Sequence, residues 1–246
     1  MSRPYTLVSV PQPVTLGLIV LQVDETVEQD MRHLFPPGEV ALHVTRIPSG
    51  ADLTPETIAD MAAALPAAAA LLPAAASFDA IAYACTSGTR LSGAARVGEL
   101  IRSACGTRAV TNPMTGTLAA LAALEVRRVA VVSPYIAAVA QPICDGLAEA
   151  GHLVTHAISF GEQVEARVAR IAPASILEAV LEAGQAPGTE AVFVSCTNLR
   201  ALEIVAEAEA ALGLPVVTSN LALGWHMARL SGRRLPEGAP GRLARL

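Results

Sequence analysis

The sequence contains no lysine, and all 17 of its basic residues are arginine. Enzymes that use pyridoxal phosphate hold it as a lysine aldimine, and class I aldolases form a Schiff base on a lysine. The phosphate-binding P-loop also needs a lysine. The absence of lysine therefore excludes all of these classes.

Charge is scarce, and long apolar runs are missing. Charged residues make up 16% of the chain and the formal net charge is −5, which argues against a nucleic-acid surface. We see no run of transmembrane length and no signal-peptide pattern. We therefore expect a cytoplasmic protein that binds neither nucleic acid nor membrane. The arginines after Leu230 are expected to lie in a solvated, poorly ordered tail.

Metal and dinucleotide motifs are also missing. The four cysteines include no CxxC pair, and the five histidines show no ligand spacing. There is no G-x-G-x-x-G fingerprint. In a chain without an export signal the cysteines are expected to be reduced thiols. We predict neither a metal nor a cofactor.

Two short segments of the chain are near copies, and each leads to a cysteine. The first, DAIAYACTS, runs over residues 79–87, and the second, EAVFVSCTN, over residues 190–198. Each has an apolar run of strand length, then Cys-Thr, then a helix-like stretch. We predict that both thiols lie at helix N-termini, where backbone N–H groups and the helix dipole lower a thiol pKa.

The duplication extends over most of the chain. Strand-like runs begin at Leu16 and Val129, 113 positions apart (129 − 16), and the two cysteines are 111 apart (196 − 85). Alternating strands and helices predict an α/β fold with parallel sheets covered on both faces. We expect two similar lobes related by a pseudo-two-fold axis, with the active site between them. Residues 1–113 and 219–246 would form the first lobe, and residues 114–218 the second.

Apolar runs and capping signals place the individual elements. Thr54 and Pro55 are a good N-cap and first helical residue. Strands are expected at 14–21, 40–47, 80–84, 109–110, 129–132, 153–159, 191–194 and 216–217. Helices are expected at 25–34, 54–72, 91–104, 116–124, 162–171, 173–183, 199–212 and 221–230. A further helix is expected after the strand at 129–132 and ends near residue 150.

The paired cysteines, Cys85 and Cys196, are the candidate catalytic residues. Both lie at the carboxyl ends of strands, where parallel-sheet enzymes bind ligands. A thiolate and a thiol on opposite sides of a small acid can racemise it, isomerise a double bond, or protonate the carbanion left by decarboxylation. Donors near the helix N-termini would stabilise the enolate-like charge. The candidates are Thr86, Ser87, Thr197 and Asn198.

Several motifs resemble a known family. The chain resembles the aspartate/glutamate racemase superfamily, in the branch with maleate cis–trans isomerase, arylmalonate decarboxylase and the ectoine-utilisation protein A group. The last group is the most similar, through Phe193–Thr197 and Val216–Asn220 with Trp225. The motifs are Gly17-Leu18-Ile19-Val20, Tyr83-Ala84-Cys85-Thr86-Ser87, Ser133-Pro134-Tyr135, Val194-Ser195-Cys196-Thr197 and Val217-Thr218-Ser219-Asn220.

The resemblance implies a cofactor-independent isomerase or racemase. Cys85 matches the family's nucleophile or base, and Cys196 matches the opposing acid. Tyr135 matches a tyrosine that binds a substrate carboxylate in maleate isomerase. Arylmalonate decarboxylase keeps only the second cysteine, so the presence of both argues against simple decarboxylation.

The chain departs from maleate isomerase where substrate would bind. Asp24 replaces an asparagine after the first strand, and residues 160–165 lack a second asparagine. Asp24 would repel a substrate carboxylate but could hold a substrate nitrogen; a helix N-cap explains it equally well. An amino-acid or ectoine-like substrate is therefore favoured over maleate. The alternatives are a decarboxylase or other lyase and a non-catalytic binding protein. We expect a small carboxylate as ligand and a homo-oligomer, a dimer or a tetramer.

Overall fold

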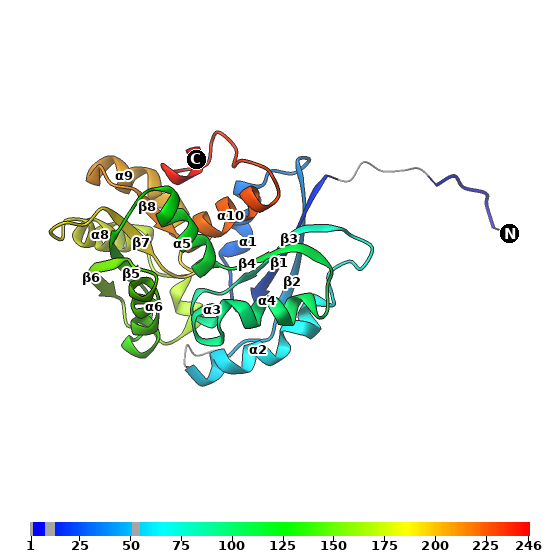
Figure 1. Ribbon diagram of the computed structural model, residues 1–246, viewed down its shortest axis with the longest axis horizontal. Coiled ribbons are helices and arrows are strands. Elements are labelled where there is room, and N and C mark those ends of the chain that lie inside the picture. The colour runs from blue at the N-terminus through cyan, green and yellow to red at the C-terminus, as the bar shows by residue number, and fades with distance from the viewer. Residues whose placement is uncertain (1, 8–12, 51–54) are drawn as a thin grey trace.

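Two four-stranded parallel sheets form the framework of the protein (Figure 1). The computed structural model describes residues 2–7, 13–50 and 55–246. The sheets have the orders β2-β1-β3-β4 and β6-β5-β7-β8. The strands are β1 (Val14–Leu21), β2 (Val40–Ile47), β3 (Phe78–Ala84), β4 (Thr107–Thr111), β5 (Arg128–Ser133), β6 (Leu153–Ser159), β7 (Ala191–Val194) and β8 (Val216–Thr218).

The two sheets have the same strand topology, and their central strand pairs have equivalent register. Leu16 pairs with Ala80 between β1 and β3, and Val129 pairs with Ala191 between β5 and β7. The partners are shifted by the 113 and 111 residues of the sequence repeat (129 − 16 and 191 − 80). The predicted α/β fold with two similar lobes is confirmed.

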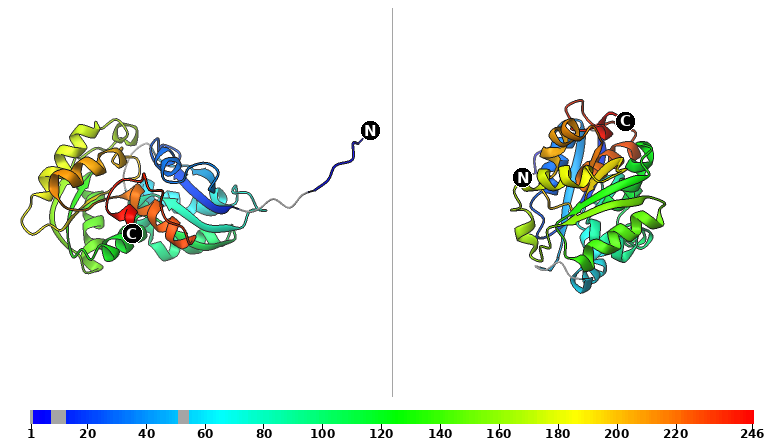
Figure 2. Two further views of the ribbon diagram at one scale, coloured as in Figure 1. Left: turned by 90° about the horizontal axis from the view of Figure 1, so that it is seen from above. Right: turned by 90° about the vertical axis from the view of Figure 1, so that its left-hand side faces the viewer.

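Helices flank both sheets and bury the apolar strands between them (Figures 1 and 2). None of the helices in the described parts of the chain is long and apolar enough to span a membrane. The helices are α1 (Val27–Leu34), α2 (Pro55–Ala69), α3 (Thr86–Ser92), α4 (Ala94–Arg102), α5 (Pro113–Ala123), α6 (Ala137–Glu149), α7 (Glu165–Val168), α8 (Pro173–Gly184), α9 (Val205–Leu212) and α10 (Ser219–Leu230), with 3₁₀ turns at Leu202–Ile204 and Leu243–Arg245.

Three predicted helices differ from the observed ones. The helix expected over 91–104 is divided into α3 and α4 at Gly93, whose φ of +83° interrupts the helical path. The helix expected over 162–171 is only the single turn of α7, and residues 199–201 are not helical. The predicted N-cap Thr54 lies outside the described residues.

The last helix joins the two halves of the molecule. α10 follows β8 of the second sheet, yet it packs against α1, α5 and β3 (Figure 2, left). Its first residue, Ser219, is therefore placed where the two halves meet. The expected boundaries at 113/114 and 218/219 stay predictions.

The tail after α10 is packed, contrary to the expectation of a solvated terminus. Leu235 and Leu243 are buried. The backbone N–H of Arg242 donates to both carboxylate oxygens of Glu209, at 3.1 and 2.9 Å. The tail's arginines suggested a solvated segment, but its last turn, Leu243–Arg245, packs against α10.

Candidate active site

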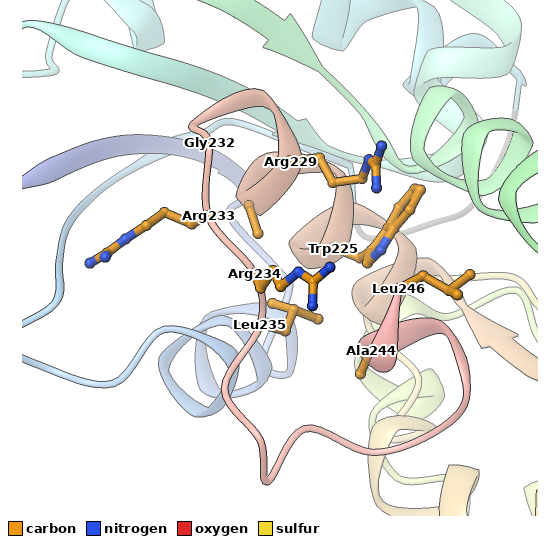
Figure 3. A pocket seen from close by; sticks show the side chains of 9 residues that line it. Trp225, Arg229, Gly232, Arg233, Arg234, Leu235, Ala244 and Leu246 are labelled. Atoms are coloured by element: carbon orange, nitrogen blue, oxygen red, sulfur yellow. The ribbon is translucent and has the colours of Figure 1, made fainter.

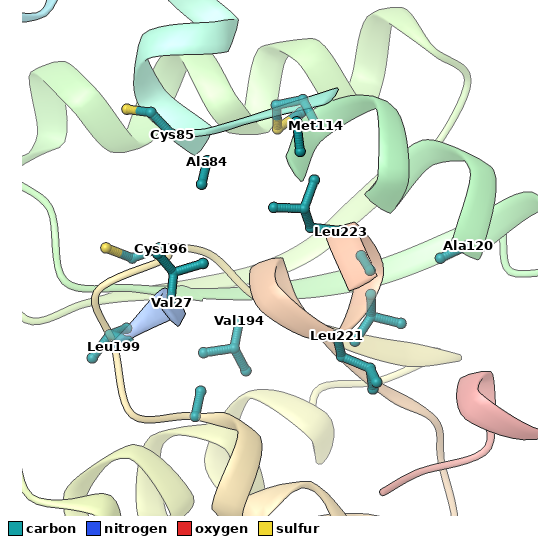
Figure 4. Close-up of a cluster of buried hydrophobic side chains, with 14 of the residues drawn as sticks. Val27, Ala84, Cys85, Met114, Ala120, Val194, Cys196, Leu199, Leu221 and Leu223 are labelled. Atoms are coloured by element: carbon teal, nitrogen blue, oxygen red, sulfur yellow. The ribbon is translucent and has the colours of Figure 1, made fainter. Parts of the chain in front are cut away.

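Cys85 and Cys196 follow equivalent strands of the two sheets, and the fold brings them into one buried region (Figure 4). Their exposed fractions are 3% and 5%. The Thr197 hydroxyl donates a hydrogen bond of 3.3 Å to the carbonyl oxygen of Ala84. This bond joins the turn at Cys196 directly to the end of the strand that carries Cys85.

A single serine connects the two cysteine turns. The Ser219 hydroxyl lies 2.9 Å from the Thr86 hydroxyl, and it accepts the backbone N–H of Cys196 at 3.0 Å. All of these groups are buried. The first turn of α10 therefore fixes the position of one cysteine turn relative to the other.

Cys85 is the N-cap of α3, as predicted for this half of the repeat. Its Sγ accepts the backbone N–H of Gly88 at 3.2 Å and lies 3.8 Å from the Ser87 hydroxyl, and the nearby Tyr83 hydroxyl acts to lower its pKa. A Cβ at position 88 would lie 2.7 Å from the Tyr83 hydroxyl and 2.8 Å from the Cys85 sulfur. Glycine is required there because the tyrosine and the thiol both approach the backbone.

Cys196 does not lie at a helix N-terminus, so the prediction is wrong for the second copy. Residues 197–201 form an irregular turn before the next helix. The φ of Cys196 is +148°, a conformation that residues with a Cβ rarely adopt. Its Sγ accepts the backbone N–H of Asn198 at 3.4 Å, and the nearby Tyr135 hydroxyl acts to lower its pKa. The two thiols are thus alike in partners, one backbone N–H and one tyrosine each, but not in backbone.

The predicted lowering of the thiol pKa is also wrong. Burial raises the pKa of Cys85 to about 11 and that of Cys196 well above its usual value. The carboxyl of Glu165 raises both further, whereas the N–H groups and tyrosines act in the opposite sense. Desolvation wins over these hydrogen bonds. Both groups are therefore neutral thiols at neutral pH.

Asp24 caps α1 with one of its carboxylate oxygens. Oδ1 accepts the backbone N–H groups of Thr26 and Val27, both at 2.8 Å. Oδ2 is buried and has no hydrogen-bond partner within 3.5 Å among the described residues, although the nearby Thr197 hydroxyl favours the charged form. Burial nevertheless raises the pKa of Asp24. The helix-cap interpretation accounts for only half of this carboxylate.

Glu165, on α7, is a second buried carboxyl beside the thiols. Its exposed fraction is 3%, and burial raises its pKa to about 7. The Tyr135 hydroxyl is influenced by the charges of Glu165, Cys85 and Cys196 together. These groups consequently lie within electrostatic reach of the Tyr135 hydroxyl.

Asn198 links the Asp24 turn to Glu165. Its Nδ2 donates to the backbone oxygen and to Oε1 of Glu165, at 3.1 and 2.9 Å. Its Oδ1 accepts the backbone N–H of Glu25 at 2.9 Å. Because the amide is engaged on both sides, Asn198 holds these elements in place, and its side chain has little capacity left for a substrate.

Sequence reasoning missed several residues of this site. Tyr83 and Ser219 stand inside the quoted motifs, so their place beside the cysteines could have been noticed there. Gly88 follows the first cysteine by three residues, the spacing of an N-cap hydrogen bond. Nothing in the local sequence distinguishes Glu165 from the partly exposed Glu162.

Arginines gather elsewhere. A pocket of about 260 Å³ beside α10 is lined by Trp225, Arg229, Arg233 and Arg234, and it contains neither cysteine (Figure 3). Within the described ranges, no group of three or more His, Cys, Asp or Glu side chains could hold a metal ion. The chemistry available beside the thiols is therefore that of two thiols, two tyrosine hydroxyls and two carboxyls.

A family model described as arylmalonate decarboxylase matches residues 16–244. The arylmalonate decarboxylase of Bordetella bronchiseptica is 35% identical over 123 residues, which are 50% of this chain and 51% of that protein. The alignment thus spans about half the length of that relative.

Solved structures agree in fold over nearly the whole chain. A variant of maleate isomerase from Pseudomonas putida S16 with maleate has a TM-score of 0.83 and 21% identity, covering 95% of this chain and 98% of that one. A Nocardia farcinica maleate cis–trans isomerase variant with a covalently bound succinylcysteine intermediate has a TM-score of 0.82 and 24% identity, and the match covers 94% of this chain and 98% of that one. A liganded arylmalonate decarboxylase variant has a TM-score of 0.82 and 28% identity, and the match covers 94% of this chain and 98% of that one. With its two-lobed fold and a family match over almost all of its length, the chain belongs to the arylmalonate decarboxylase family.

Proposed function

We propose that the protein is a cofactor-independent isomerase or racemase that acts on the carbon next to a carboxylate of a small acid, with Cys85 and Cys196 as its catalytic pair. The observation that carries the proposal is the pairing of the thiols. Each follows the equivalent strand of its lobe, each accepts one backbone N–H, and each has a nearby tyrosine hydroxyl that acts to lower its pKa. Two matched groups suit a reaction in which a proton leaves one face of a carbon and another arrives on the opposite face.

In the racemase form of the reaction, one thiolate removes the proton on the α-carbon and the opposing thiol donates its own proton to the other face. The electron pair of the broken C–H bond rests on the carboxylate as an enolate-like charge. Burial favours the neutral thiols, so one thiol has to release its proton to water as the substrate binds.

In the cis–trans form, one thiolate adds to one carbon of the double bond of an unsaturated acid, and the opposing thiol protonates the neighbouring carbon. The adduct rotates about the resulting single bond. Return of that proton to the opposing sulfur and elimination of the first thiolate then restore the double bond. The covalent succinylcysteine in the Nocardia farcinica relative supports this chemistry for the fold. Either form uses the same two sulfurs.

The hydroxyls around the thiols divide into two roles. Thr86 and Thr197 make the bonds that join the lobes, so we assign them to positioning the cysteine turns. Ser87 and Tyr135 lie against the two sulfurs, and we assign them to the substrate carboxylate. We further propose, from the motifs around Cys196 and Trp225, that the ectoine-utilisation protein A group holds the nearest relatives. A cytoplasmic homo-oligomer remains part of the proposal.

Decarboxylation is the second candidate. The family match and the Bordetella bronchiseptica relative favour it. It needs one thiol to protonate the carbanion left by loss of CO₂, whereas racemisation and isomerisation by the two-thiol route need both groups.

The two reactions are separated by incubating the purified protein in D₂O with maleate, aspartate, glutamate and phenylmalonate and recording proton NMR spectra. We expect exchange at the α-carbon or cis–trans conversion in the wild type. Cys85→Ser and Cys196→Ser should each lower the rate by roughly 10²–10⁴-fold, the usual contribution of an acid or base. Cys105→Ser and Cys144→Ser are matched controls. CO₂ release that depends on Cys196 alone would replace the proposal with the decarboxylase.

A further inference from the structure

We propose that Asp24 and Glu165 form a subsite for a positively charged nitrogen of the substrate, so that the enzyme takes a small acid carrying an ammonium or amidinium group. The inference rests on the proposed function and names the substrate class of the same site. Three features carry it: the unused oxygens, the surrounding charges and the position of the two carboxyls.

The first observation is that each carboxyl has one unused oxygen. Oδ2 of Asp24 and Oε2 of Glu165 are buried and have no hydrogen-bond partner within 3.5 Å among the described residues. Both residues have an exposed fraction of only 3%. Buried polar atoms are almost always hydrogen-bonded, and exceptions point to a missing partner. Two unpaired acceptors within electrostatic reach of one another fit a ligand that brings N–H donors.

The second observation is the missing counter-charge. Among the residues that the structure describes, no arginine forms an ion pair with Asp24 or Glu165. Arg46 favours the charge of Asp24, but its own ion pair is with Glu28. A dicarboxylate would add two negative charges to this region, whereas a cationic nitrogen would satisfy the unpaired oxygens and neutralise charge.

The third observation is the position relative to the thiols. Glu165 raises the pKa of both cysteines, and Asp24 raises that of Cys196, so both carboxyls lie within electrostatic reach of the reacting sulfurs. A cation held here lies within the same reach of the carbon between the thiols. The carboxylate of the substrate would then be directed to the hydroxyls of Ser87 and Tyr135.

A consequence for catalysis follows from the same contacts. The carboxyls oppose ionisation of the thiols, and a bound cation would offset that effect. One thiol would therefore release its proton to water more readily when the correct substrate is present. An acid of the same size without a positive charge would bind without making ionisation of the thiol easier.

The rigid links around the pair suit recognition of a fixed group. Asn198 holds Glu165 through two hydrogen bonds and holds the Asp24 turn through the N–H of Glu25. The hydroxyl of Thr26 donates to the backbone oxygen of Asn198 at 2.9 Å. Both carboxyls are thus positioned before a ligand arrives, which lowers the entropy lost on binding.

The test compares three probes of one chain length that differ only at the far end: 3-aminopropanoate, 3-hydroxypropanoate and succinate. Binding to the intact protein is measured by competition NMR at neutral pH. We expect 3-aminopropanoate to bind about tenfold more tightly than succinate, the size of one charge-assisted hydrogen bond. Glu165→Gln and Asp24→Asn should each reduce that ratio by about the same factor. Both variants keep the oxygens that accept from Asn198 and from the α1 backbone.

Glu162→Gln is the matched control, because Glu162 lies three residues away and makes its ion pair with Arg167. Its ratio should equal that of the wild type. A wild-type preference for succinate would overturn the proposal and would show that the carboxyls bind as neutral donors. An unchanged ratio in both site variants would overturn it as well. The thiol variants and D₂O exchange test the proposed reaction separately, so loss of the reaction with a retained probe preference would reject only the function.

Discussion

The hydroxyl of Ser219 lies 2.9 Å from the hydroxyl of Thr86, and this contact joins the start of α10 to the turn that carries Cys85. The same serine oxygen accepts the backbone N–H of Cys196. One side chain therefore sets the spacing of the two thiols. The contact is possible because α10 follows the second sheet yet packs against α1, α5 and β3.

Replacing Ser219 by alanine should lower activity more than binding. The buried N–H of Cys196 would lose its acceptor, at a cost of about 1–3 kcal/mol in the free energy of unfolding. The thiols would remain but their spacing would relax, so kcat should fall by about tenfold with a smaller change in KM. Urea unfolding and steady-state kinetics measure both effects.

Ser231→Ala is the control for this variant, because that hydroxyl donates to Met227 and Ala228 at the far end of α10. A Ser219→Ala enzyme with an unchanged kcat would show that the contact does not position the thiols.

Gly88→Ala should disturb Cys85 directly. The added Cβ would meet the Tyr83 hydroxyl at 2.7 Å and the Cys85 sulfur at 2.8 Å. Overpacking of this kind costs roughly 1–3 kcal/mol, and the thiol would lose its alignment with the Gly88 N–H. Thermal unfolding and the rate of thiol alkylation measure the change.

Gly98→Ala provides the comparison within α4. There the Cβ would meet only the end of the Arg102 side chain, at 2.9 Å. Helix propensity should then make Gly98→Ala neutral or stabilising by up to about 1 kcal/mol. Equal destabilisation by both substitutions would contradict the close approach of tyrosine and thiol at Gly88.

Cys196→Gly should be more stable than Cys196→Ala. The φ of +148° is unfavourable for alanine and open to glycine, and such strain costs about 1–3 kcal/mol. The greater chain entropy of unfolded glycine opposes this by about 0.4–1 kcal/mol. The strain outweighs this entropy, so the free energy of unfolding measured in urea should be about 1 kcal/mol higher for Cys196→Gly than for Cys196→Ala.

The matched pair at position 85 should show the reverse order, because Cys85 has an ordinary extended backbone with φ −147°. A glycine variant that is the less stable one at both positions would argue against strain at Cys196.

Stability should fall as pH rises from about 4.5 to 7 because of Glu165. Burial raises its pKa from 4.5 to about 7, so the folded chain holds this proton more tightly than the unfolded chain. The resulting stabilisation is fully present below the unfolded pKa and is lost as pH rises through the folded value. Its limit is on the order of 3 kcal/mol.

Glu165→Gln should flatten this dependence, measured by urea unfolding at several pH values from 4 to 8. Asp30 accepts a hydrogen bond from the Asn220 amide, and burial also raises its pKa to about 7. A second, similar pH dependence of stability should therefore remain in this variant. Parallel pH profiles for wild type and Glu165→Gln would mean that Glu165 does not titrate in this range.

The strands and the pair of cysteines could be predicted because their signals are local. Apolar runs such as Val14–Leu21 can be buried only inside a covered sheet, and the matched Cys-Thr turns had to end equivalent strands. The turn after Cys196 could not be predicted, because its residues have helical character. What prevents a helix there is the set of distant bonds from Asn198 to Glu25 and Glu165.

The sequence by itself determined the duplicated α/β plan, the exclusion of lysine chemistry and the two cysteines at strand ends, since each depends on residue identity and spacing along the chain. Only the tertiary structure decided that both thiols are neutral at rest, that Glu165 lies beside them, and that Ser219 fixes their spacing. Charge and pKa depend on desolvation and on neighbours brought together from both lobes. A helix N-cap lowers a thiol pKa near water, but here burial outweighs it.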